Sequence, residues 1–291
     1  MTRLGALFAA LLLAACTSKI STVEPPTALK RIDAQVNADR VWRAVVGGEE
    51  QDDLLLPLAP NSDGRRVYIA GRDGSTRWIV DQPVPSLSMR GGARPVISGE
   101  HVYAGFDNGK IAAYELARGQ MSWEVPLATP SGRSEVERLV DADGIFQVTA
   151  DELFAVAFHG RAAALELASG RTLWQRDMSS ARGLAADPVA VYVTDADSQV
   201  WALDRNNGGP LWTQADLRAR GITAPVRVGD ALAVGDFEGY IHLLDAETGR
   251  IVGRTRVGPT PIVAPPLAVG DLLVAQDVRG RVTAWRISKR G

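Results

Sequence analysis

The fold is decided by residues 224–253, which read APVRVGDALAVGDFEGYIHLLDAETGRIVG. Each of three short apolar runs in this stretch is followed by turn residues, which are Gly229-Asp230, residues 235–239 and residues 245–249. Gly and Asp readily adopt the backbone angles that tight turns need. The stretch therefore predicts an antiparallel meander of short strands. Because a single meander cannot bury both of its faces, further copies are expected in the chain.

The same order of strands and turns recurs, and most copies end in a tryptophan. Trp123, Trp174 and Trp212 close three of them and lie 51 and 38 residues apart. A period of about 40 residues that holds four short strands is typical of a propeller blade. The clear copies are residues 94–123, residues 141–174, a copy ending at Trp212, residues 224–253 with Gly253 in place of Trp, and residues 265–286. We therefore predict an all-β fold, a β-propeller of four-stranded antiparallel blades.

A sixth, weaker copy spans residues 54–78. Residues 55–58 are predicted as its inner strand and residues 66–71 as its second strand, and the chain then reaches Trp78 without room for a third. This blade is therefore either short or completed by a strand from elsewhere. Residues 41–46 resemble a lone final strand, and the copy 265–286 lacks its fourth strand. We predict that residues 41–46 supply this outer strand and close the ring, which protects otherwise open sheet edges.

The N-terminus has the features of a bacterial lipoprotein signal. Arg3 precedes a short apolar run, and residues 13–16 read Leu-Ala-Ala-Cys, which resembles a lipobox. We predict a signal peptide over residues 1–15 and a lipid on Cys16. Residues 16–40, with Pro25-Pro26 and few large apolar side chains, are predicted as a flexible tether, and residues 41–291 as the propeller. Thr17 in place of Asp favours the outer membrane, with the protein lipid-anchored on its periplasmic face.

The overall composition excludes several classes of function. A formal net charge of −2 offers no basic face for nucleic acid. Cys16 is the single cysteine, so an intrachain disulfide cannot form. His101, His159 and His242 lie in different repeats without metal-ligand spacing, and no cofactor is expected. Carboxylates recur at matching points of successive repeats, where turn capping explains them better than a metal site. They are Asp107, Asp195, Asp197, Asp236 and Asp277.

Two segments between repeats are longer than a turn requires. Residues 81–94 place Leu87 and Met89 beside Arg90, and residues 128–144 contain Asp141 and Asp143. Long loops that carry apolar and charged residues on a rigid scaffold are frequent binding sites. The alternative is that Leu87 and Met89 fill space between blades while the two aspartates cap turns. The residues alone leave both interpretations open.

The two loops also carry a resemblance to a known family. Residues 85–91 (PSLSMRG), the Gly-Gln-Met-x-Trp of residues 119–123, the Asp-x-Asp loop and residues 211–217 (LWTQADL) resemble the BamB family of outer-membrane β-barrel assembly lipoproteins. The resemblance implies a non-enzymatic periplasmic scaffold that docks on BamA and assists insertion of β-barrel proteins, with unfolded outer-membrane protein chains as a further partner. By position, Leu87, Met89 and Arg90 match one docking loop of the family, and Asp141 and Asp143 match the other.

One departure and two alternatives accompany this resemblance. The family pattern implies eight blades, and about two blades are lacking between Trp42 and Pro85. The repeat also resembles that of quinone-dependent dehydrogenase propellers, but the chain lacks a Ca²⁺-loop spacing of acidic and amide residues. A surface lipoprotein that binds peptide or glycan is the second alternative.

Overall fold

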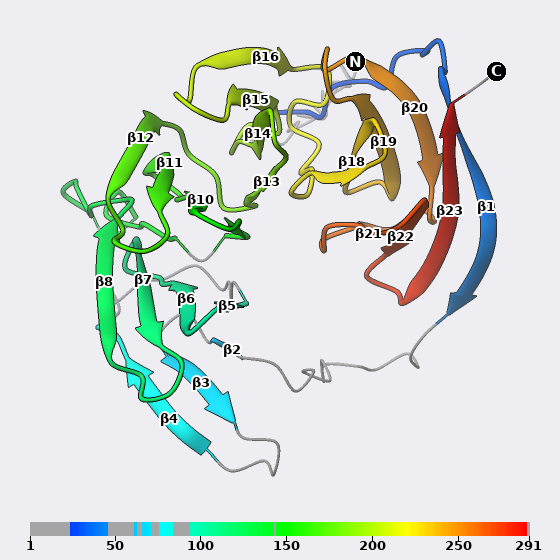
Figure 1. The fold of residues 1–291 in the computed structure, drawn as a ribbon. Helices are drawn as coiled ribbons and strands as arrows, with labels where there is room; N and C mark the ends of the chain where they lie inside the picture. The colour runs from blue at the N-terminus through cyan, green and yellow to red at the C-terminus, as the bar shows by residue number, and fades with distance from the viewer. Residues whose placement is uncertain are drawn as a thin grey trace, which may run out of the picture.

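The computed structural model describes residues 24–45, 61–62, 66–70, 76–83, 94–134, 136–142 and 144–289. These residues form an all-β molecule with six antiparallel sheets, and the sheets follow one another around an arc (Figure 1). In the sheets made of four consecutive strands, the first strand lies toward the inside of the arc and the last toward the outside, and in the remaining four-stranded sheet β21 lies inside and β1 outside (Figure 1). The predicted propeller architecture of four-stranded antiparallel blades is thereby confirmed. No helix in the described ranges is long and apolar enough to cross a membrane.

Four of the sheets are built from consecutive strands of the chain. The second sheet contains β5 (Val96–Ser98), β6 (His101–Gly105), β7 (Lys110–Glu115) and β8 (Met121–Pro126). The third contains β9 (Gln147–Val148), β10 (Glu152–Val156), β11 (Arg161–Glu166) and β12 (Thr172–Asp177). The fourth contains β13 (Leu184–Ala186), β14 (Ala190–Thr194), β15 (Val200–Asp204) and β16 (Pro210–Gln214). The fifth, the meander of residues 224–253, contains β17 (Val226–Val228), β18 (Ala231–Gly235), β19 (Tyr240–Asp245) and β20 (Ile251–Arg256).

The sixth sheet joins the two ends of the chain. Its strand order is β1-β23-β22-β21, with β1 at Val36–Val45, β21 at Leu267–Val269, β22 at Leu272–Gln276 and β23 at Arg281–Lys289. The N-terminal strand thus pairs with the C-terminal repeat, as predicted, although it begins at Val36 instead of residue 41. Trp42 lies opposite Ala284, which reproduces the pairing of Trp123 with Ala113 in the second sheet.

The first sheet has three described strands, β2 (Asn61–Ser62), β3 (Arg66–Ala70) and β4 (Thr76–Asp81). Of the two alternatives left open by the sequence, the described sheet matches the short blade. The predicted second strand, residues 66–71, is observed as β3, the middle one of the three described strands, and its Ile69 pairs directly with Trp78. In complete sheets the third strand makes this pairing with the tryptophan strand. The predicted strand at residues 55–58 lies outside the described residues.

Buried apolar clusters lie between successive sheets. Trp78 and Val80 of β4 pack on buried residues of β6 and β7, and comparable clusters fill the next four interfaces. Small residues such as Ala112, Ala113, Ala163 and Ala164 allow the sheets to approach closely. This alternation of sheet and apolar layer explains why the central strands β6, β10, β14 and β18 are buried on both faces.

A contact between tryptophan and glycine repeats at four of these interfaces. The indole N–H of Trp123 donates to the carbonyl of Leu167 at 3.1 Å, and its ring covers Gly170 in the turn of the next sheet. The corresponding pairs are Trp78 with Gly119, Trp174 with Gly208, and Trp212 with Gly249. Each of these glycines has a positive φ and no room for a Cβ. The outer strands β4, β8, β12 and β16 are therefore each fastened to the following sheet by one aromatic side chain.

Three of the recurring aspartates, Asp195, Asp236 and Asp277, cap their own turns, as the sequence indicated. One carboxylate oxygen of Asp195 accepts the backbone N–H groups of Asp197 and Gln199, and Asp236 and Asp277 do the same two and four residues ahead. The second oxygen accepts a donor that differs between sheets. The donor is the Trp201 indole in the fourth sheet, His242 and Arg220 in the fifth, and Arg281 in the sixth.

Candidate functional site

Most of the residues predicted for partner docking lie outside the described residues. This applies to Leu87, Met89, Arg90 and Asp143, and also to the predicted lipid attachment site, Cys16. Asp141 is described, and the structure defines the chain on both sides of the two loops. The site is therefore built here from the bases of residues 81–94, the first loop, and residues 128–144, the second loop.

The first loop begins against the second sheet. The side-chain amide of Gln82, which is buried, donates to Tyr114 Oη at 2.9 Å and to Glu124 at 2.9 Å. Asn108, in the turn between β6 and β7, donates to the carbonyl of Pro83 at 3.1 Å. Glu124 is held in turn by Lys110 at 2.5 Å. Gln82 is thus fixed between two strands, and Asn108 fixes the next residue, Pro83, so that the start of the first loop is held on the scaffold.

The second loop begins and ends at the same turn. The backbone N–H groups of Leu127 and Ala128 both donate to the carbonyl of Gly109, at 2.9 and 3.0 Å. At the other end of the loop, Ala142 N–H donates to the carbonyl of Phe106 at 3.1 Å. Gly109 has φ +78°, and a Cβ there would lie 2.7 Å from the Ala128 carbonyl oxygen. A glycine is therefore required at this position by both backbone angle and space.

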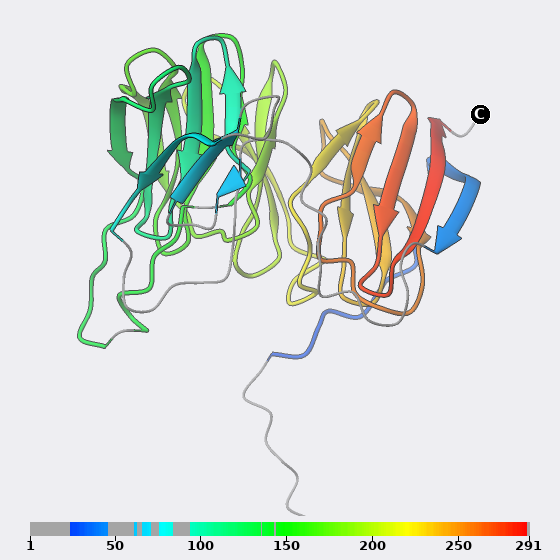
Figure 2. The same ribbon diagram turned by 90° about the horizontal axis from the view of Figure 1, so that it is seen from below.

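The second loop contains a turn that is closed by hydrogen bonds within the loop itself. Ser134 Oγ accepts Glu137 N–H at 3.2 Å, while the Glu137 carboxylate accepts the N–H groups of Arg133 and Ser134. These two backbone donors lower the pKa of Glu137. Val136 is 67% exposed at this turn, and the loop projects beyond the ends of the strands (Figure 2). The reciprocal pattern is that of a capping box, and it gives the exposed part of the loop a definite shape.

Asp141 lies beneath the surface of the second loop. It is 3% exposed and forms an isolated bridge with Phe158, whose N–H donates to the Asp141 carbonyl at 2.7 Å. Val140 and Ala142 on either side are also buried. The ring of His159 contacts the carbonyl of Leu139 at 3.0 Å. Asp141 is thus part of the seam between the second and third sheets, where it supports the loop from below.

The bases of both loops therefore converge on one short hairpin turn, residues 106–109. Asn108 contacts the start of the first loop, and Phe106 and Gly109 hold both ends of the second. Sequence reasoning identified this segment only as a turn and did not single out Gln82, Asn108 or Gly109 as site residues. The Asp-Asn-Gly sequence signals the turn, but the contacts link residues far apart in the chain, and no local pattern reports them.

The part of the chain described here contains no group of three or more His, Cys, Asp and Glu side chains that could hold a metal ion. Asp195, Asp236 and Asp277 lie in three different sheets, and each caps its own turn. The bases of the two loops share one turn, and the described part of the second loop projects from it; loops on a rigid scaffold are frequent binding sites.

Comparison with known proteins decides the family. The family model described as outer membrane protein assembly factor BamB matches residues 33–214 and 204–290, which is nearly the whole described chain. The chain belongs to the BamB family. BamB of Alkalilimnicola ehrlichii is 41% identical over 204 residues, which cover 70% of this chain and 53% of that protein. BamB of Yersinia pestis is 32% identical over 262 residues, covering 89% of this chain and 66% of that protein.

Solved structures agree on the fold. The crystal structure of BamB from Moraxella catarrhalis superposes with a TM-score of 0.73 at 30% identity and covers 77% of this chain and 68% of that one. A europium-containing methanol dehydrogenase shares the fold alone, with a TM-score of 0.51 at 12% identity. This BamB-family chain spans about half to two-thirds of the length of the curated relatives just named.

Proposed function

We propose that this chain is a non-enzymatic scaffold lipoprotein of the outer membrane that supports the assembly of outer-membrane proteins. Its relatives are named outer membrane protein assembly factors, and the sequence begins with the features of a lipoprotein signal that ends at Cys16. On this proposal the lipid on Cys16 holds the propeller at the periplasmic face of the membrane. The protein binds BamA through its two loops and brings unfolded outer-membrane chains near the site of insertion.

The observation that carries the docking proposal is the convergence of both loop bases on residues 106–109. A shared base gives two loops a fixed separation, so that they can act as one surface without a large loss of entropy on binding. In this surface Leu87 and Met89 would supply an apolar anchor, and Arg90 a planar cation for a carboxylate or carbonyl of the partner. Asp143 would add negative charge for orientation, while buried Asp141 would hold the loop in shape.

Recovery of the partner from membranes tests the proposal. The full-length protein is used to capture its partners from solubilised outer membrane, and we expect wild type to recover the β-barrel assembly complex. Arg90→Glu should abolish this recovery while the urea midpoint stays unchanged, because the reversed charge meets the partner and not the core.

A charge-matched control lies on the same sheet. Arg118 is exposed in the turn between β7 and β8, at the opposite end of β7 from residues 106–109. Arg118→Glu carries the same change of charge and should bind like wild type. The docking assignment is wrong if Arg90→Glu and Arg118→Glu recover equal amounts of the complex.

The alternative functions require separate assays. A quinone-dependent dehydrogenase activity is tested with purified protein, quinone cofactor and Ca²⁺, and any turnover contradicts a purely structural role. A peptide- or glycan-binding lipoprotein would bind such ligands with no recovery of the assembly complex.

A further inference from the structure

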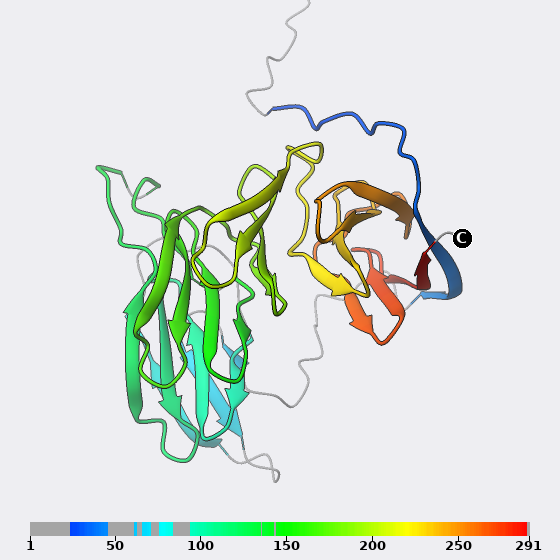
Figure 3. The ribbon, with the colours of Figure 1, turned by 45° about the horizontal axis from the view of Figure 1, so that its top comes forward.

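The segment before β1 lies across the seam between the fourth and fifth sheets. Figure 3 shows this segment running from the connection after β16 to the outer side of β20. Thr27 N–H donates to the Arg218 carbonyl at 3.1 Å, and Gln35 N–H donates to the Val252 carbonyl at 2.7 Å. Residues 24–35 therefore make backbone hydrogen bonds at both ends, one to each side of the seam. We call this segment the strap.

Arg220 holds the strap from inside the molecule. Its side chain is 2% exposed, and its guanidinium donates to Asp236 Oδ2 at 2.9 and 2.7 Å and also to Glu238. The other terminal nitrogen of the guanidinium, Nη1, faces the strap and donates to the Thr27 carbonyl at 2.9 Å. A planar guanidinium suits this role because its donors leave in fixed directions. The strap carbonyl thus completes the coordination of a buried cation.

A second arginine holds the middle of the strap. Arg254 of β20 donates from Nε to His242 Nδ1 at 3.2 Å and from Nη1 to the Lys30 carbonyl at 3.2 Å. Because Nδ1 of His242 accepts, Nε2 carries the proton and donates to Asp236 at 3.0 Å. Arg220, Asp236, His242 and Arg254 therefore form one chain of hydrogen bonds that ends on two strap carbonyls.

The fifth sheet has also lost its tryptophan where the strap meets β1. The neighbouring sheet has no turn between its third and fourth strands, because its fourth strand is β1 from the other end of the chain. A tryptophan at position 253 would have no glycine turn to cover. Instead, a Cβ at Gly253 would lie 3.2 Å from the Val36 carbonyl oxygen and 3.1 Å from Leu243 Cδ1. The backbone of Val36 therefore lies close to the point where a side chain at position 253 would begin.

From these contacts we infer that residues 24–35 are a fixed part of the propeller and not part of the lipid tether, and that Arg220 and Arg254 are the positioning residues that hold them. The inference concerns the position of the membrane link and does not depend on the docking loops. The stretch from Cys16 to Glu24, about eight residues, spans at most about 28 Å when fully extended. A tether reaching to residue 40 would span about 84 Å. The strap therefore keeps the propeller close to the membrane and makes the tether leave it at the seam between the fourth and fifth sheets.

Trypsin cleavage after Lys30 and Arg31 reports strap release directly. Both side chains are exposed, but a protease needs the backbone to leave the surface before it can cut. Thr27→Pro and Gln35→Pro each remove one strap N–H donor and leave the buried arginines untouched. Loss of one hydrogen bond should raise the cleavage rate at these sites about fivefold, and loss of both about twentyfold. The urea midpoint of the full-length protein should stay the same, which separates strap release from unfolding.

Ala28→Pro is the matched control. Ala28 is exposed, and its N–H donates to no backbone carbonyl among the described residues. Equal cleavage rates in Ala28→Pro and in the double variant would overturn the inference, as would wild-type cleavage as fast as that of a free peptide of residues 24–35.

The distance between the propeller and the membrane is measured on the lipidated protein in vesicles by energy transfer from a label at Asp177→Cys to headgroup acceptors. The double variant should show a longer mean distance, and an unchanged distance would refute the effect on tether length. If the protein does not bind vesicles, the prediction of a lipid on Cys16 is wrong. The trypsin result then decides whether the strap is fixed to the propeller.

Discussion

His242 lies fully buried between Asp236 and Arg254, in the hydrogen-bonded chain beneath the strap. Burial disfavours the charged ring and lowers the pKa of His242, and this effect outweighs the attraction of Asp236. Burial alone would raise the pKa of Asp236, but hydrogen bonds from His242, Tyr240 N–H and Arg220 hold it below its usual value. The pair is therefore a carboxylate beside a neutral imidazole at neutral pH.

The lowered pKa of His242 predicts loss of stability in mild acid. The unfolded chain takes up a proton near pH 6.5, while the folded protein resists it, so unfolding is favoured as pH falls below about 6.5 toward the folded pKa. One such group lowers the free energy of unfolding by at most about 1.4 kcal/mol per pH unit in this window. Urea unfolding of wild type between pH 7.5 and 5.5 should show this slope. His242→Gln, which keeps a donor for Asp236 but cannot titrate, should reduce it, and an unchanged slope would assign the effect to another group.

At the scale of elements, the contact between tryptophan and glycine links each of the first four sheets to the next. Gly170 combines φ +72° with a Cβ position 2.7 Å from Trp123 Cδ2. Gly99 has φ +59° with nothing within 4 Å. Both glycines therefore need a left-handed backbone, but only Gly170 also needs empty space above it. This difference allows the steric part of the contact to be measured separately.

Alanine at these two positions should give different losses of stability. Gly99→Ala carries only the cost of a left-handed residue, about 1 kcal/mol. Gly170→Ala carries the same cost and in addition displaces Trp123, for a further loss of about 1–3 kcal/mol. The measurement is the urea midpoint of each variant. Equal midpoints would mean that the ring moves aside freely and does not fasten the sheets.

The tryptophan spacing is also what made the sheets predictable from sequence. Trp123, Trp174 and Trp212 each lie four residues after a turn glycine, and this local pattern placed the outer strands of three sheets correctly. The strand β3 was located correctly from sequence, but an apolar strand of five residues reads alike in the second and third positions of a sheet. Only its pairing with β4 tells them apart. Sequence also identified Gly253 as an exception, but the cause lies at the other end of the chain.

The candidate site was predictable to the same limited extent. Loop length and residue type singled out residues 81–94 and 128–144. They did not show that both bases meet at Asn108 and Gly109, because hydrogen bonds such as that from Asn108 to Pro83 join different sheets. The hydrogen bonds that link Arg220, Asp236 and His242 were missed for the same reason. A buried ion pair between a connection and a hairpin has no periodic signature in sequence.

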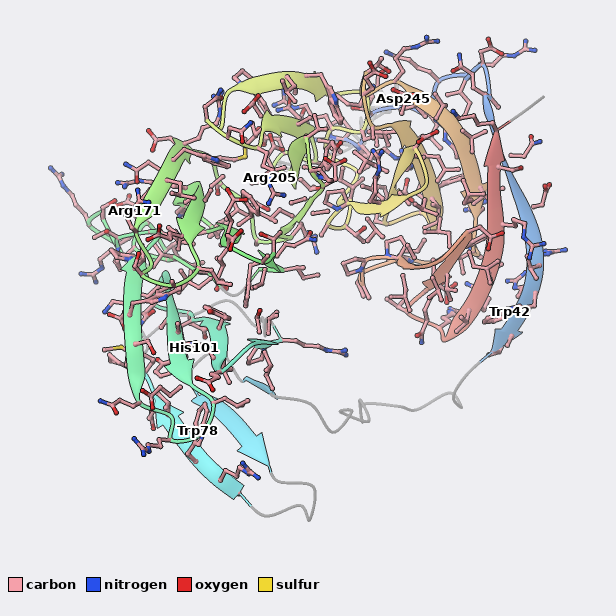
Figure 4. The ribbon with its side chains drawn as sticks, viewed as in Figure 1. Trp42, Trp78, His101, Arg171, Arg205 and Asp245 are labelled. Atoms are coloured by element: carbon pink, nitrogen blue, oxygen red, sulfur yellow. The ribbon has the colours of Figure 1, made fainter. Side chains whose placement is uncertain are left out.

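At the scale of the whole molecule, the sheets form an arc with the three-stranded first sheet at one end and the sixth sheet at the other (Figure 1). Trp78 and Trp42 mark these two ends (Figure 4). Trp78 is engaged with the second sheet, whereas Trp42 on β1 is 44% exposed. Integrity of the last sheet therefore depends on pairing between β1 and β23, which brings residues from the two ends of the chain together.

The two faces of β1 provide a direct test of this dependence. Ala38 pairs with Ile287 and packs against the cluster that contains Leu273 and Trp285, whereas its neighbour Asn37 is exposed. Ala38→Asp places a carboxylate against this cluster and should lower the free energy of unfolding by about 1–3 kcal/mol. Asn37→Asp also places an aspartate on β1 but directs it to solvent, and should change stability by less than about 0.5 kcal/mol.

The two variants are compared by urea unfolding, with hydrogen exchange at β22 and β23 to locate the effect. If β1 is essential to the last sheet, exchange in these strands rises in Ala38→Asp and stays at the wild-type rate in Asn37→Asp. Equal protection in both variants would show that the sheet is stable without its N-terminal strand.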